Sequence, residues 1–247
     1  MAQVYLVTGA NRGLGKAIVE TYLARSDVTV IAAVRDPKAS TSKALESLPK
    51  GKGSKILLVK IDSSVAGDPA AAIKDIQAAG ITHIDTVIAN AGISDDFTPV
   101  TKVSIDAFQR HMDVNGYGTL YLIQAVDPLL AKSQNPKFVA VGSALGSISG
   151  MEQRAQMPSA AYGPSKAVVH WLIRKLHFEN PGLTAFCVDP GWVQTDMGYF
   201  GAKTFGMEKP PTTVEECVKG MVSVIDSASR EKSGGHNLVW DGSEFPW

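Results

Sequence analysis

Seven short apolar segments alternate along the chain with stretches of helical periodicity. The apolar segments lie near residues 4–8, 28–34, 55–61, 84–90, 137–142, 183–188 and 236–240. They have the length of strands, and most stretches between them repeat apolar residues every three or four positions, as a helix does. Parallel strands need long crossovers, so strands that alternate with helices predict a sheet covered on both faces. The pattern therefore predicts a doubly wound α/β fold with a mainly parallel, seven-stranded sheet.

Length and composition fit one domain over residues 1–247. Hydrophobic residues make up 45% of the chain and charged residues 19%, which is typical of a globular protein without large disordered regions. No internal repeat or linker divides the sequence. Two irregular stretches, near 147–161 and 197–211, each follow the carboxyl end of a predicted strand. Ligands bind at that end of open α/β sheets, so we predict that both stretches are substrate loops.

Charge and hydropathy argue against several classes of protein. Lys and Arg together number 24, as do Asp and Glu, so the chain lacks the basic surplus typical of proteins that bind nucleic acid or anionic membranes. No apolar run approaches the roughly 18 residues that span a bilayer. The first predicted strand follows the N-terminus almost directly, without the charged and apolar regions of a secretory signal. We therefore expect a cytoplasmic protein.

The first predicted strand runs into a glycine-rich turn, Thr8-Gly-Ala-Asn-Arg-Gly-Leu-Gly15, and a helical pattern follows. Gly9 suits a tight turn, and Gly13 and Gly15 keep side chains away from a bound pyrophosphate, which the first amides of the helix would face. The spacing is G-x-x-x-G-x-G rather than G-x-G-x-x-G. A turn that only joins a strand to a helix is the alternative. The order of strand, turn and helix favours a phosphate-binding site.

A tyrosine and a lysine lie four positions apart in Tyr162-Gly-Pro-Ser-Lys166. Positions i and i+4 share one face of a helix, so Lys166 can lie beneath Tyr162. A cation there is expected to lower the pKa of the phenol from its usual value of about 10. Such a phenol would donate and accept protons in carbonyl chemistry. Ordinary amphipathic helices also produce this spacing, so the interpretation depends on the other motifs.

Four further motifs complete a pattern that resembles the short-chain dehydrogenase/reductase family over nearly the whole chain. They are Asn90-Ala-Gly92, Met112-Asp-Val-Asn-Gly116, Val141-Gly-Ser-Ala-Leu-Gly146 and Asp189-Pro-Gly-Trp-Val-Gln-Thr195. The resemblance implies a Rossmann fold and a nicotinamide cofactor. The cofactor-binding residues that it implies are Gly9, Asn11, Arg12, Gly13, Leu14, Gly15, Arg35, Asp62, Asn90, Ala91, Gly92, Tyr162, Lys166, Pro190, Gly191, Val193 and Thr195.

The same resemblance implies four catalytic residues. Ser143 and Tyr162 would donate hydrogen bonds to a substrate carbonyl, and Tyr162 would pass its proton to that oxygen. Lys166, the cofactor ribose and a water held at Asn115 would then return a proton to Tyr162. Taken alone, Ser143 could instead make a local backbone bond, and Asn115 could lie at a helix kink. The family often has a second serine where Gly142 stands.

Cofactor preference is predicted from the end of the second strand. An acidic residue there would bind the adenosine ribose and select NAD, whereas an arginine would bind the 2′-phosphate of NADP. Arg35 precedes Asp36 at this place, and Arg12 in the glycine turn is a second candidate for the phosphate. The alternative is that Arg35 and Asp36 form a solvated surface pair. We predict NADPH/NADP, with Asp62 near the adenine by resemblance.

The histidines and cysteines show no metal-binding spacing. Cys187 and Cys217 lie in apolar patterns typical of core positions, without a C-x-x-C partner or a disulfide framework. The five histidines form no H-x-x-x-H or H-E-x-x-H arrangement. His170 and His177 lie seven positions apart on a predicted helix and are interpreted as packing or interface residues. No metal site is predicted.

Apolar side chains of the two irregular stretches are candidates for a substrate pocket. They are Leu145, Met151, Met157, Trp192, Tyr199 and Phe200. Aromatic and methionine side chains suit flat or irregular ligands, although the same residues could simply pack a lid. Ser143 and Tyr162 are 19 positions apart (162 − 143), a longer spacing than is common in the family, which adds length to the first loop.

Two groups within the family resemble this chain more closely. Lys175-Leu-His-Phe-Glu-Asn180 and Asp241-Gly-Ser-Glu-Phe-Pro-Trp247 are similar to segments of fungal norsolorinic acid ketoreductases of secondary metabolism. Ser143-Ala-Leu-Gly-Ser-Ile148 is similar to sniffer-type carbonyl reductases. The resemblance implies an NADPH-dependent reductase that transfers hydride to a ketone or quinone, with an aromatic polyketide among the candidates. A homodimer or homotetramer is the expected assembly. An NAD-dependent alcohol dehydrogenase and a non-catalytic cofactor-binding signalling protein remain alternatives.

Overall fold

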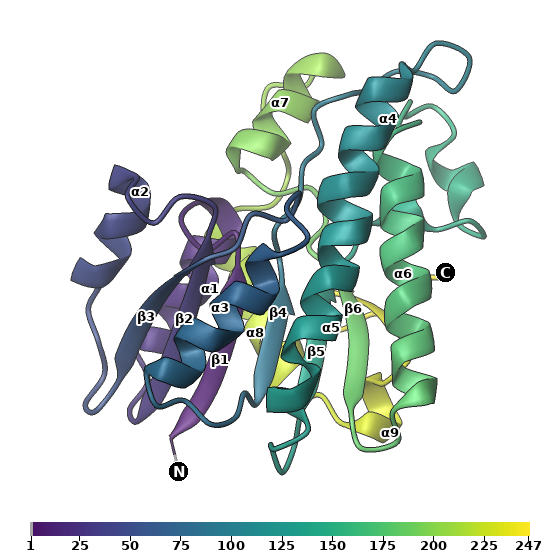
Figure 1. The fold of residues 1–247 in the computed structure, drawn as a ribbon. Helices are drawn as coiled ribbons and strands as arrows, with labels where there is room; N and C mark the ends of the chain where they lie inside the picture. The colour runs from purple at the N-terminus through teal and green to yellow at the C-terminus, as the bar shows by residue number, and fades with distance from the viewer. Residues whose placement is uncertain (1) are drawn as a thin grey trace.

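The protein is built around one seven-stranded sheet, seen in a computed structural model that describes residues 2–247. All seven strands are parallel, in the order β3-β2-β1-β4-β5-β6-β7 (Figure 1). They are β1 Gln3–Thr8, β2 Val28–Val34, β3 Lys55–Lys60, β4 Thr86–Ala89, β5 Lys137–Val141, β6 Thr184–Asp189 and β7 Asn237–Val239. The seven predicted strands are confirmed, and the sheet is wholly rather than mainly parallel. The doubly wound α/β fold is confirmed with it.

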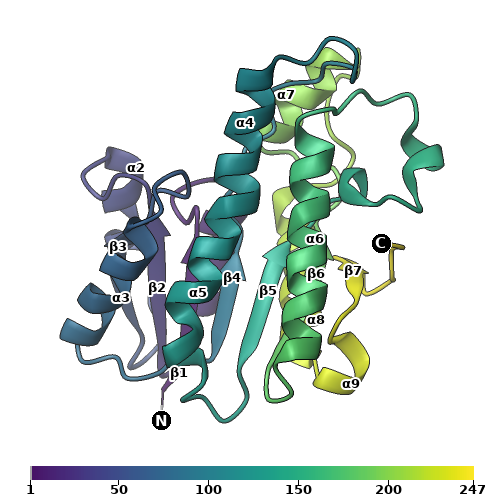
Figure 2. The same cartoon turned by 45° about the vertical axis from the view of Figure 1, so that its right-hand side comes forward.

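Helices cover both faces of the sheet (Figures 1 and 2). On one face lie α1 (Gly13–Leu23) and α8 (Val214–Ser227), which contact each other and share a core with Tyr22, Phe186 and Met221. The other face carries α3 (Asp68–Ala78), α5 (Gly118–Leu130) and α6 (Tyr162–Glu179), around Leu6, Leu129 and Phe138. Both faces of the strands are therefore buried, which explains their continuous apolar runs.

The remaining elements are short. They are α2 Ser40–Lys43, η1 Ala44–Ser47, α4 Ile105–His111, the π-helical turn η2 Met112–Tyr117, the 3₁₀ turns η3 Ala144–Gly146 and η4 Met151–Arg154, α7 Asp196–Thr204 and α9 Arg230–Ser233. The stretch 197–211 was expected to be irregular, and that expectation is wrong for its first half, which is helix α7. The hydroxyl of Thr195 caps α7 by accepting a hydrogen bond from the Gly198 amide at 3.2 Å.

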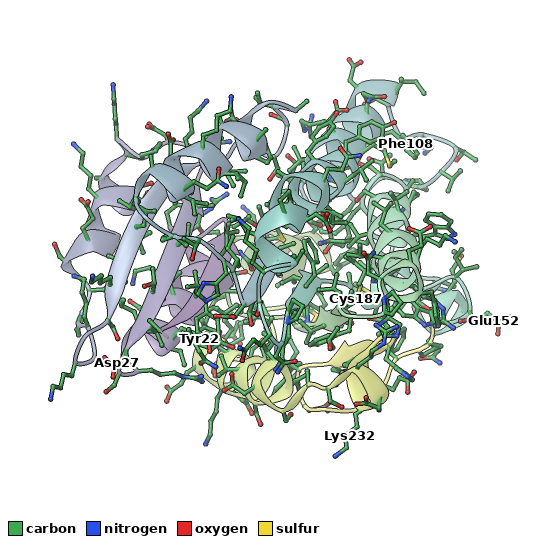
Figure 3. The ribbon with its side chains drawn as sticks, turned by 60° about the horizontal axis from the view of Figure 1, so that its bottom comes forward. Tyr22, Asp27, Phe108, Glu152, Cys187 and Lys232 are labelled. Carbon is green, nitrogen blue, oxygen red and sulfur yellow. The ribbon has the colours of Figure 1, made fainter. Side chains whose placement is uncertain are left out.

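The carboxyl ends of the strands form the edge at which the predicted site residues gather. The strand order reverses between β1 and β4, and open α/β sheets form their ligand-binding crevice above the carboxyl edge at such a reversal. Helix α7 stands over the same edge (Figure 1). Both cysteines are buried and unpaired, as predicted, and Cys187 lies inside the molecule (Figure 3). Within residues 2–247, no helix is both long and apolar enough to cross a membrane.

Candidate active site

The glycine turn after β1 approaches the neighbouring backbone too closely for side chains. Gly9 has φ +63°, a conformation that glycine adopts without strain. A Cβ atom on Gly15 would lie 2.3 Å from the Gly9 carbonyl oxygen and 2.6 Å from Nδ2 of Asn90. The turn therefore packs directly against the segment after β4. It presents the amino end of α1 at the crevice, as a pyrophosphate site requires.

The segment after β4 is bonded to the start of that turn through Asn90 and Ala91. The amides of Asn90 and Ala91 both donate to Oγ1 of Thr8 at 3.0 Å, and Nδ2 of Asn90 donates to the Thr8 carbonyl at 2.8 Å. A Cβ atom on Gly92 would lie 3.1 Å from Oδ1 of Asn115 and 3.7 Å from Nζ of Lys166. The Asn90-Ala-Gly92 segment thus connects the glycine turn to two of the predicted catalytic residues.

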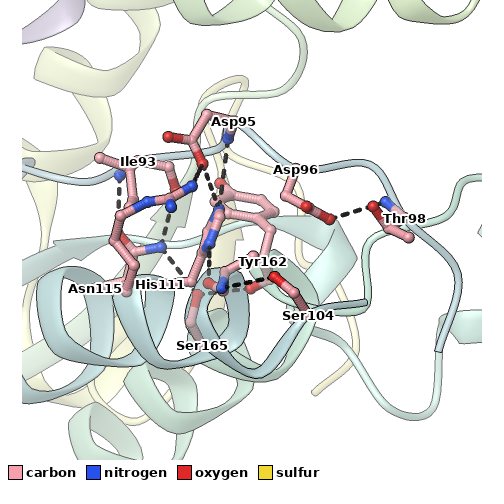
Figure 4. A network of polar contacts seen from close by, with 11 residues as sticks. Ile93, Asp95, Asp96, Thr98, Ser104, His111, Asn115, Tyr162 and Ser165 are labelled. Atoms are coloured by element: carbon pink, nitrogen blue, oxygen red, sulfur yellow. Dashed lines mark hydrogen bonds and ion pairs between the residues drawn. The ribbon is translucent and has the colours of Figure 1, made fainter. Parts of the chain in front are cut away.

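Asn115 lies in the π-helical turn between α4 and α5. Its position at a helix irregularity agrees with the alternative that it lies at a helix kink. Its side chain accepts from the Ile93 amide at 2.8 Å and donates to the Ile93 carbonyl at 3.0 Å. It also donates to Oγ of Ser165 at 2.9 Å. Figure 4 shows His111, Asn115 and Ser165 gathered around Tyr162. The Asn115 amide therefore ties α6 to the segment after β4.

Tyr162 and Lys166 lie one turn apart at the start of α6, as predicted. Nζ of Lys166 is 5.7 Å from the centre of the Tyr162 ring and donates to the Val141 carbonyl at 2.8 Å. Both side chains are buried. The expected lowering of the Tyr162 pKa is wrong. Burial raises that pKa, a side-chain hydrogen bond with Ser143 acts against the rise, and the charge of Asp189 adds to it.

Burial acts on the lysine in the opposite direction. It lowers the pKa of Lys166 to about 8, while the nearby Cys187 and Asp189 act against the shift. Desolvation disfavours a charged group of either sign, so the phenol holds its proton more firmly and the ammonium holds its proton less firmly. As the pH rises above about 8, Lys166 therefore loses its proton while Tyr162 remains protonated.

Ser143 follows β5 and faces Tyr162. Its hydroxyl accepts from the Leu145 amide at 3.2 Å, and it lies close enough to the Tyr162 side chain to act on the pKa of that phenol. The Ser143 amide donates to Nε2 of His170 at 3.3 Å. Burial and the Lys166 charge lower the pKa of His170 to about 4, so the neutral ring can accept this bond.

Gly142 makes room for His170. A Cβ atom on Gly142 would lie 2.9 Å from Nε2 of His170 and 3.4 Å from Oδ1 of Asn237. A second serine at this position, as is common in the family, would crowd the imidazole. The buried histidines His170 and His177 pack within the protein, as the sequence predicted.

The residues predicted to select the cofactor surround the ends of β2 and β3. No ion pair joins Arg35 to Asp36 within residues 2–247, and the Asp36 carboxylate instead accepts from the Lys38 amide at 2.9 Å. Arg35 lies near Asp62. Burial alone would raise the pKa of Asp62, but hydrogen bonds from Ser64 and the Arg35 charge outweigh it and hold the pKa below its usual value. Arg35 and Asp36 are both exposed, and the charge of Arg35 acts on Asp62 rather than forming an ion pair with its neighbour.

The other side of the glycine turn faces α2 and α7. Nδ2 of Asn11 donates to Oγ1 of Thr41 at 2.9 Å, and the guanidinium of Arg12 lies 3.8 Å from the Asp196 carboxylate. A Cβ atom on Gly13 would lie 3.4 Å from Cγ2 of Thr195. The glycine turn and the segment after β6 therefore converge across the crevice.

These observations fit a dinucleotide. Side chains are excluded at Gly9 and Gly15, an exposed arginine stands at the end of β2, and a buried Lys166 lies beside Gly92. Glycine turns that precede a helix leave backbone amides free for phosphate. The predicted cofactor residues, which extend from the glycine turn to the segment Pro190–Thr195, occupy the same carboxyl edge.

Aromatic side chains form a cluster beneath α7. The Phe97 ring stacks on the Phe200 ring, with ring centres 5.8 Å apart. It meets the Phe205 ring edge to face, with ring centres 5.1 Å apart. The Trp192 and Phe205 rings meet edge to face with ring centres 6.0 Å apart, and the Trp192 indole N–H donates to the Gly198 carbonyl at 2.9 Å. Trp192 is thus packed against α7, which agrees with the alternative that these residues pack a lid. Tyr199 and Phe200 remain about half exposed, at 45% and 47%.

The first predicted substrate loop is fixed by the last residues of the chain. The Ser149 amide donates to a Trp247 oxygen at 2.9 Å, and the Arg154 guanidinium stacks over Phe245 at 4.4 Å. Met151 is exposed at 58%, whereas Met157 and Leu145 are partly buried. Leu145 belongs to the turn that carries Ser143, so it is the one of these three residues that lies closest in the chain to the predicted catalytic serine.

Sequence reasoning missed several residues of this site. Asp189 is buried at the end of β6 and accepts two backbone hydrogen bonds. His111 is fully buried, with Nδ1 2.8 Å from the Ala107 carbonyl and Nε2 accepting from the Asp95 amide at 3.4 Å. Phe97 completes the aromatic cluster from the segment after β4. An acidic residue inside an apolar strand pattern, such as Asp189, was the one signal available in the sequence.

Known proteins are similar to this chain both in sequence and in fold. The sequence pattern described as short chain dehydrogenase matches residues 3–202. Norsolorinic acid ketoreductase nor1 of Dothistroma septosporum is 47% identical, over 98% of this chain and 92% of that protein. The resemblance to norsolorinic acid ketoreductases is thereby confirmed.

Solved structures give the same result. The NADPH-bound carbonyl reductase from chicken fatty liver superposes with a TM-score of 0.87 at 27% identity, covering 100% of this chain and 99% of that one. The carbonyl reductase Sniffer of D. melanogaster gives 0.84 at 23% identity over 100% of both chains, which supports the fold. The match to residues 3–202 and a relative at 47% identity establish that the chain belongs to the short-chain dehydrogenase/reductase family.

Proposed function

We propose that the protein is an NADPH-dependent ketoreductase that reduces the carbonyl of a ketone or quinone. The observation that carries the proposal is the grouping of Ser143, Tyr162 and Lys166 at the carboxyl edge of the sheet, next to Asn115 and Gly92. The relatives named as norsolorinic acid ketoreductase and carbonyl reductase support reduction as the direction of the reaction.

The four side chains divide the work of the reaction. Ser143 and Tyr162 donate hydrogen bonds to the substrate carbonyl oxygen and stabilise the negative charge that grows on it. Tyr162 then gives its proton to that oxygen. Lys166 stabilises the phenolate that remains, and Asn115 fixes α6 relative to the segment after β4. NADPH supplies the hydride when it is bound.

The residues at the carboxyl edge of the sheet would hold the cofactor. The amides of the glycine turn would receive the pyrophosphate, and Arg35 would receive the 2′-phosphate. Arg12, whose guanidinium lies 3.8 Å from the Asp196 carboxylate, is the second candidate for that phosphate. Asp62 would contact the adenine, Asn90 to Gly92 the ribose, and Pro190 to Thr195 the nicotinamide. The exposure of Arg35 at the end of β2 supports its role, because an accessible guanidinium can form charge-assisted bonds to phosphate.

We further propose a flat, multi-ring ketone or quinone as the substrate. Tyr199 and Phe200 keep about half of their surface exposed on α7, and Leu145 lies beside Ser143. Aromatic pairs stack with about 0.5–1.5 kcal/mol beyond simple burial. The norsolorinic acid ketoreductase relative supports an aromatic substrate.

A cofactor-consumption screen tests the proposed function. Purified protein is mixed with NADPH or NADH and with a polycyclic aromatic ketone, a quinone or a short aliphatic aldehyde. The proposal predicts fastest consumption with NADPH and a polycyclic carbonyl. A preference for NADH and alcohol oxidation would favour the alcohol dehydrogenase alternative, and cofactor binding without turnover would favour the signalling alternative.

Replacing Arg35 by alanine is expected to weaken NADPH binding much more than NADH binding. The lost phosphate contact corresponds to roughly 1.5–3 kcal/mol, or about 10- to 150-fold in affinity. Fluorescence titration with both cofactors measures the ratio, and Lys52→Ala, an exposed lysine before β3, serves as the control. Equal losses for NADPH and NADH would remove Arg35 from the phosphate site.

The rate of reduction is expected to fall above about pH 8. Reduction needs a proton on the Tyr162–Lys166 pair. Burial raises the pKa of Tyr162 but lowers that of Lys166 to about 8, so Lys166 loses its proton first as the pH rises. The measurement is kcat/KM for the ketone at saturating NADPH across the alkaline range. A rate that stays constant to about pH 10 would contradict the role of Lys166.

A further inference from the structure

A buried carboxylate joins the two halves of the site. Asp189 ends β6 and is only 6% exposed. Its Oδ2 accepts from the Ala144 amide at 2.7 Å, and its Oδ1 accepts from the Gly191 amide at 2.8 Å. Ala144 follows Ser143 directly, and Gly191 belongs to the turn assigned to the nicotinamide. One side chain therefore bonds both backbone segments between which the carbonyl and the nicotinamide would meet.

We propose that Asp189 is a positioning residue that fixes the distance between the Ser143 turn and the Pro190–Gly191 turn. This inference rests on the proposed function. A carboxylate suits the task because each oxygen accepts a separate N–H bond, and bonds to a charged acceptor are short and strong. An amide side chain has one acceptor end only. Its NH2 end would face a backbone N–H, so one of the two segments would lose its anchor.

The Ser143 turn is also bonded to a second side chain, that of His170. Nε2 of His170 accepts from the Ser143 amide at 3.3 Å, so consecutive amides of this turn bond to α6 and to β6. His170 fixes the turn relative to Tyr162 on the same helix. Asp189 fixes it relative to Gly191. The serine hydroxyl is thereby positioned against both the proton donor and the predicted place of the hydride.

Asp189 also contributes charge to the site. The ionisable groups that interact with it are Arg154 from η4, Tyr162 and Lys166 from α6, Cys187 from β6 and Cys217 from α8. Burial lowers the pKa of Lys166, and the Asp189 charge acts in the opposite direction. Removal of this charge would let the pKa of Lys166 fall further. A purely structural carboxylate, distant from the site, would have no such effect.

The test compares Asp189→Asn with Asp85→Asn. Asp85 is a matched control at the amino end of β4, because its carboxylate accepts from the Val4 amide at 2.9 Å and from Oγ of Ser133 at 2.6 Å. Asp189→Asn is expected to lower kcat about 10- to 100-fold, the scale of a misplaced reacting group, while KM for NADPH changes little. Its primary deuterium isotope effect should rise, and its alkaline limb should move to lower pH. Asp85→Asn should change none of these.

Amide hydrogen exchange gives a readout that does not depend on turnover. In the wild type, the Ala144 and Gly191 amides should be protected although both lie outside the strands. One of the two should exchange faster in Asp189→Asn. If the variant does not fold, wild-type exchange decides: exchange of both amides at the rate of exposed loop residues would overturn the inference.

The failures of the two proposals are distinguishable. An unchanged kcat, isotope effect and alkaline limb in folded Asp189→Asn, beside an active wild type, would overturn the positioning role alone. A wild-type protein that reduces no carbonyl would overturn the proposed function, while amide exchange would still decide whether Asp189 anchors both turns.

Discussion

Replacing Tyr162 by phenylalanine is expected to lower turnover at least about a hundredfold while leaving NADPH affinity nearly intact. The change removes only the phenolic oxygen, and with it the proton donor, whose loss has the scale of general acid catalysis. The ring stays in place at the start of α6, beside Lys166. Steady-state kinetics and a fluorescence titration with NADPH measure the two quantities separately.

Tyr117→Phe provides the control for this experiment. Tyr117 ends the π-helical turn and is 41% exposed, so loss of its hydroxyl should leave turnover unchanged. If Tyr162→Phe keeps more than about a tenth of the wild-type rate, another group supplies the proton.

Replacing Ser143 by alanine is expected to lower kcat about 100- to 1000-fold. This is the scale for loss of one donor to a developing oxyanion. The serine has a second role, because its hydroxyl accepts from the Leu145 amide and caps the turn η3. Loss of a cap alone would cost about 1 kcal/mol of stability and leave the activity of folded molecules unchanged.

The two roles separate when kcat and thermal unfolding are measured on the same variants. Ser229 is a matched control, since it caps α9 by accepting from the Lys232 amide at 3.3 Å. Ser229→Ala should lower stability slightly and leave kcat unchanged. If Ser143→Ala behaves in the same way, Ser143 is a structural cap only.

The strands were predictable because both faces of the sheet are buried. Strands such as β2 and β6 consist almost wholly of buried residues, so their apolar runs stand out from the helical stretches. The glycine turn was predictable because its spacing reflects close backbone contacts, such as that between Gly15 and the Gly9 carbonyl. Tyr162 and Lys166 were predictable because four positions make one helical turn.

Other features depend on information that a local pattern does not contain. In the π-helical turn at Asn115, the backbone bonds span five residues instead of the four of an α-helix. No residue type in this segment signals that difference. The direction in which the Tyr162 pKa shifts depends on burial by segments distant in the sequence. The four-residue spacing indicates only that the Lys166 cation is near. Helix α7 exposes Met197, Tyr199 and Phe200, so its apolar residues do not follow the periodicity of a buried helix face.

The tertiary role of Asp189 illustrates the same limit. The sequence shows one acidic residue before Pro190, and nothing local indicates that Ala144, 45 positions earlier, donates to it. Phe97 is likewise a single aromatic residue in an irregular segment until the fold brings it beside Phe200 and Phe205. Such residues become visible only when the carboxyl ends of several strands are assembled.

The most direct test of the account follows the hydride itself. NADPH that carries deuterium at the transferable position of its nicotinamide is incubated with the wild-type protein and a polycyclic aromatic ketone, and the alcohol is analysed by mass spectrometry. We expect one deuterium on the former carbonyl carbon, and at most about a hundredth of this product with Tyr162→Phe at the same time point. An alcohol without deuterium, or no alcohol at all from a folded protein that binds NADPH, would contradict it.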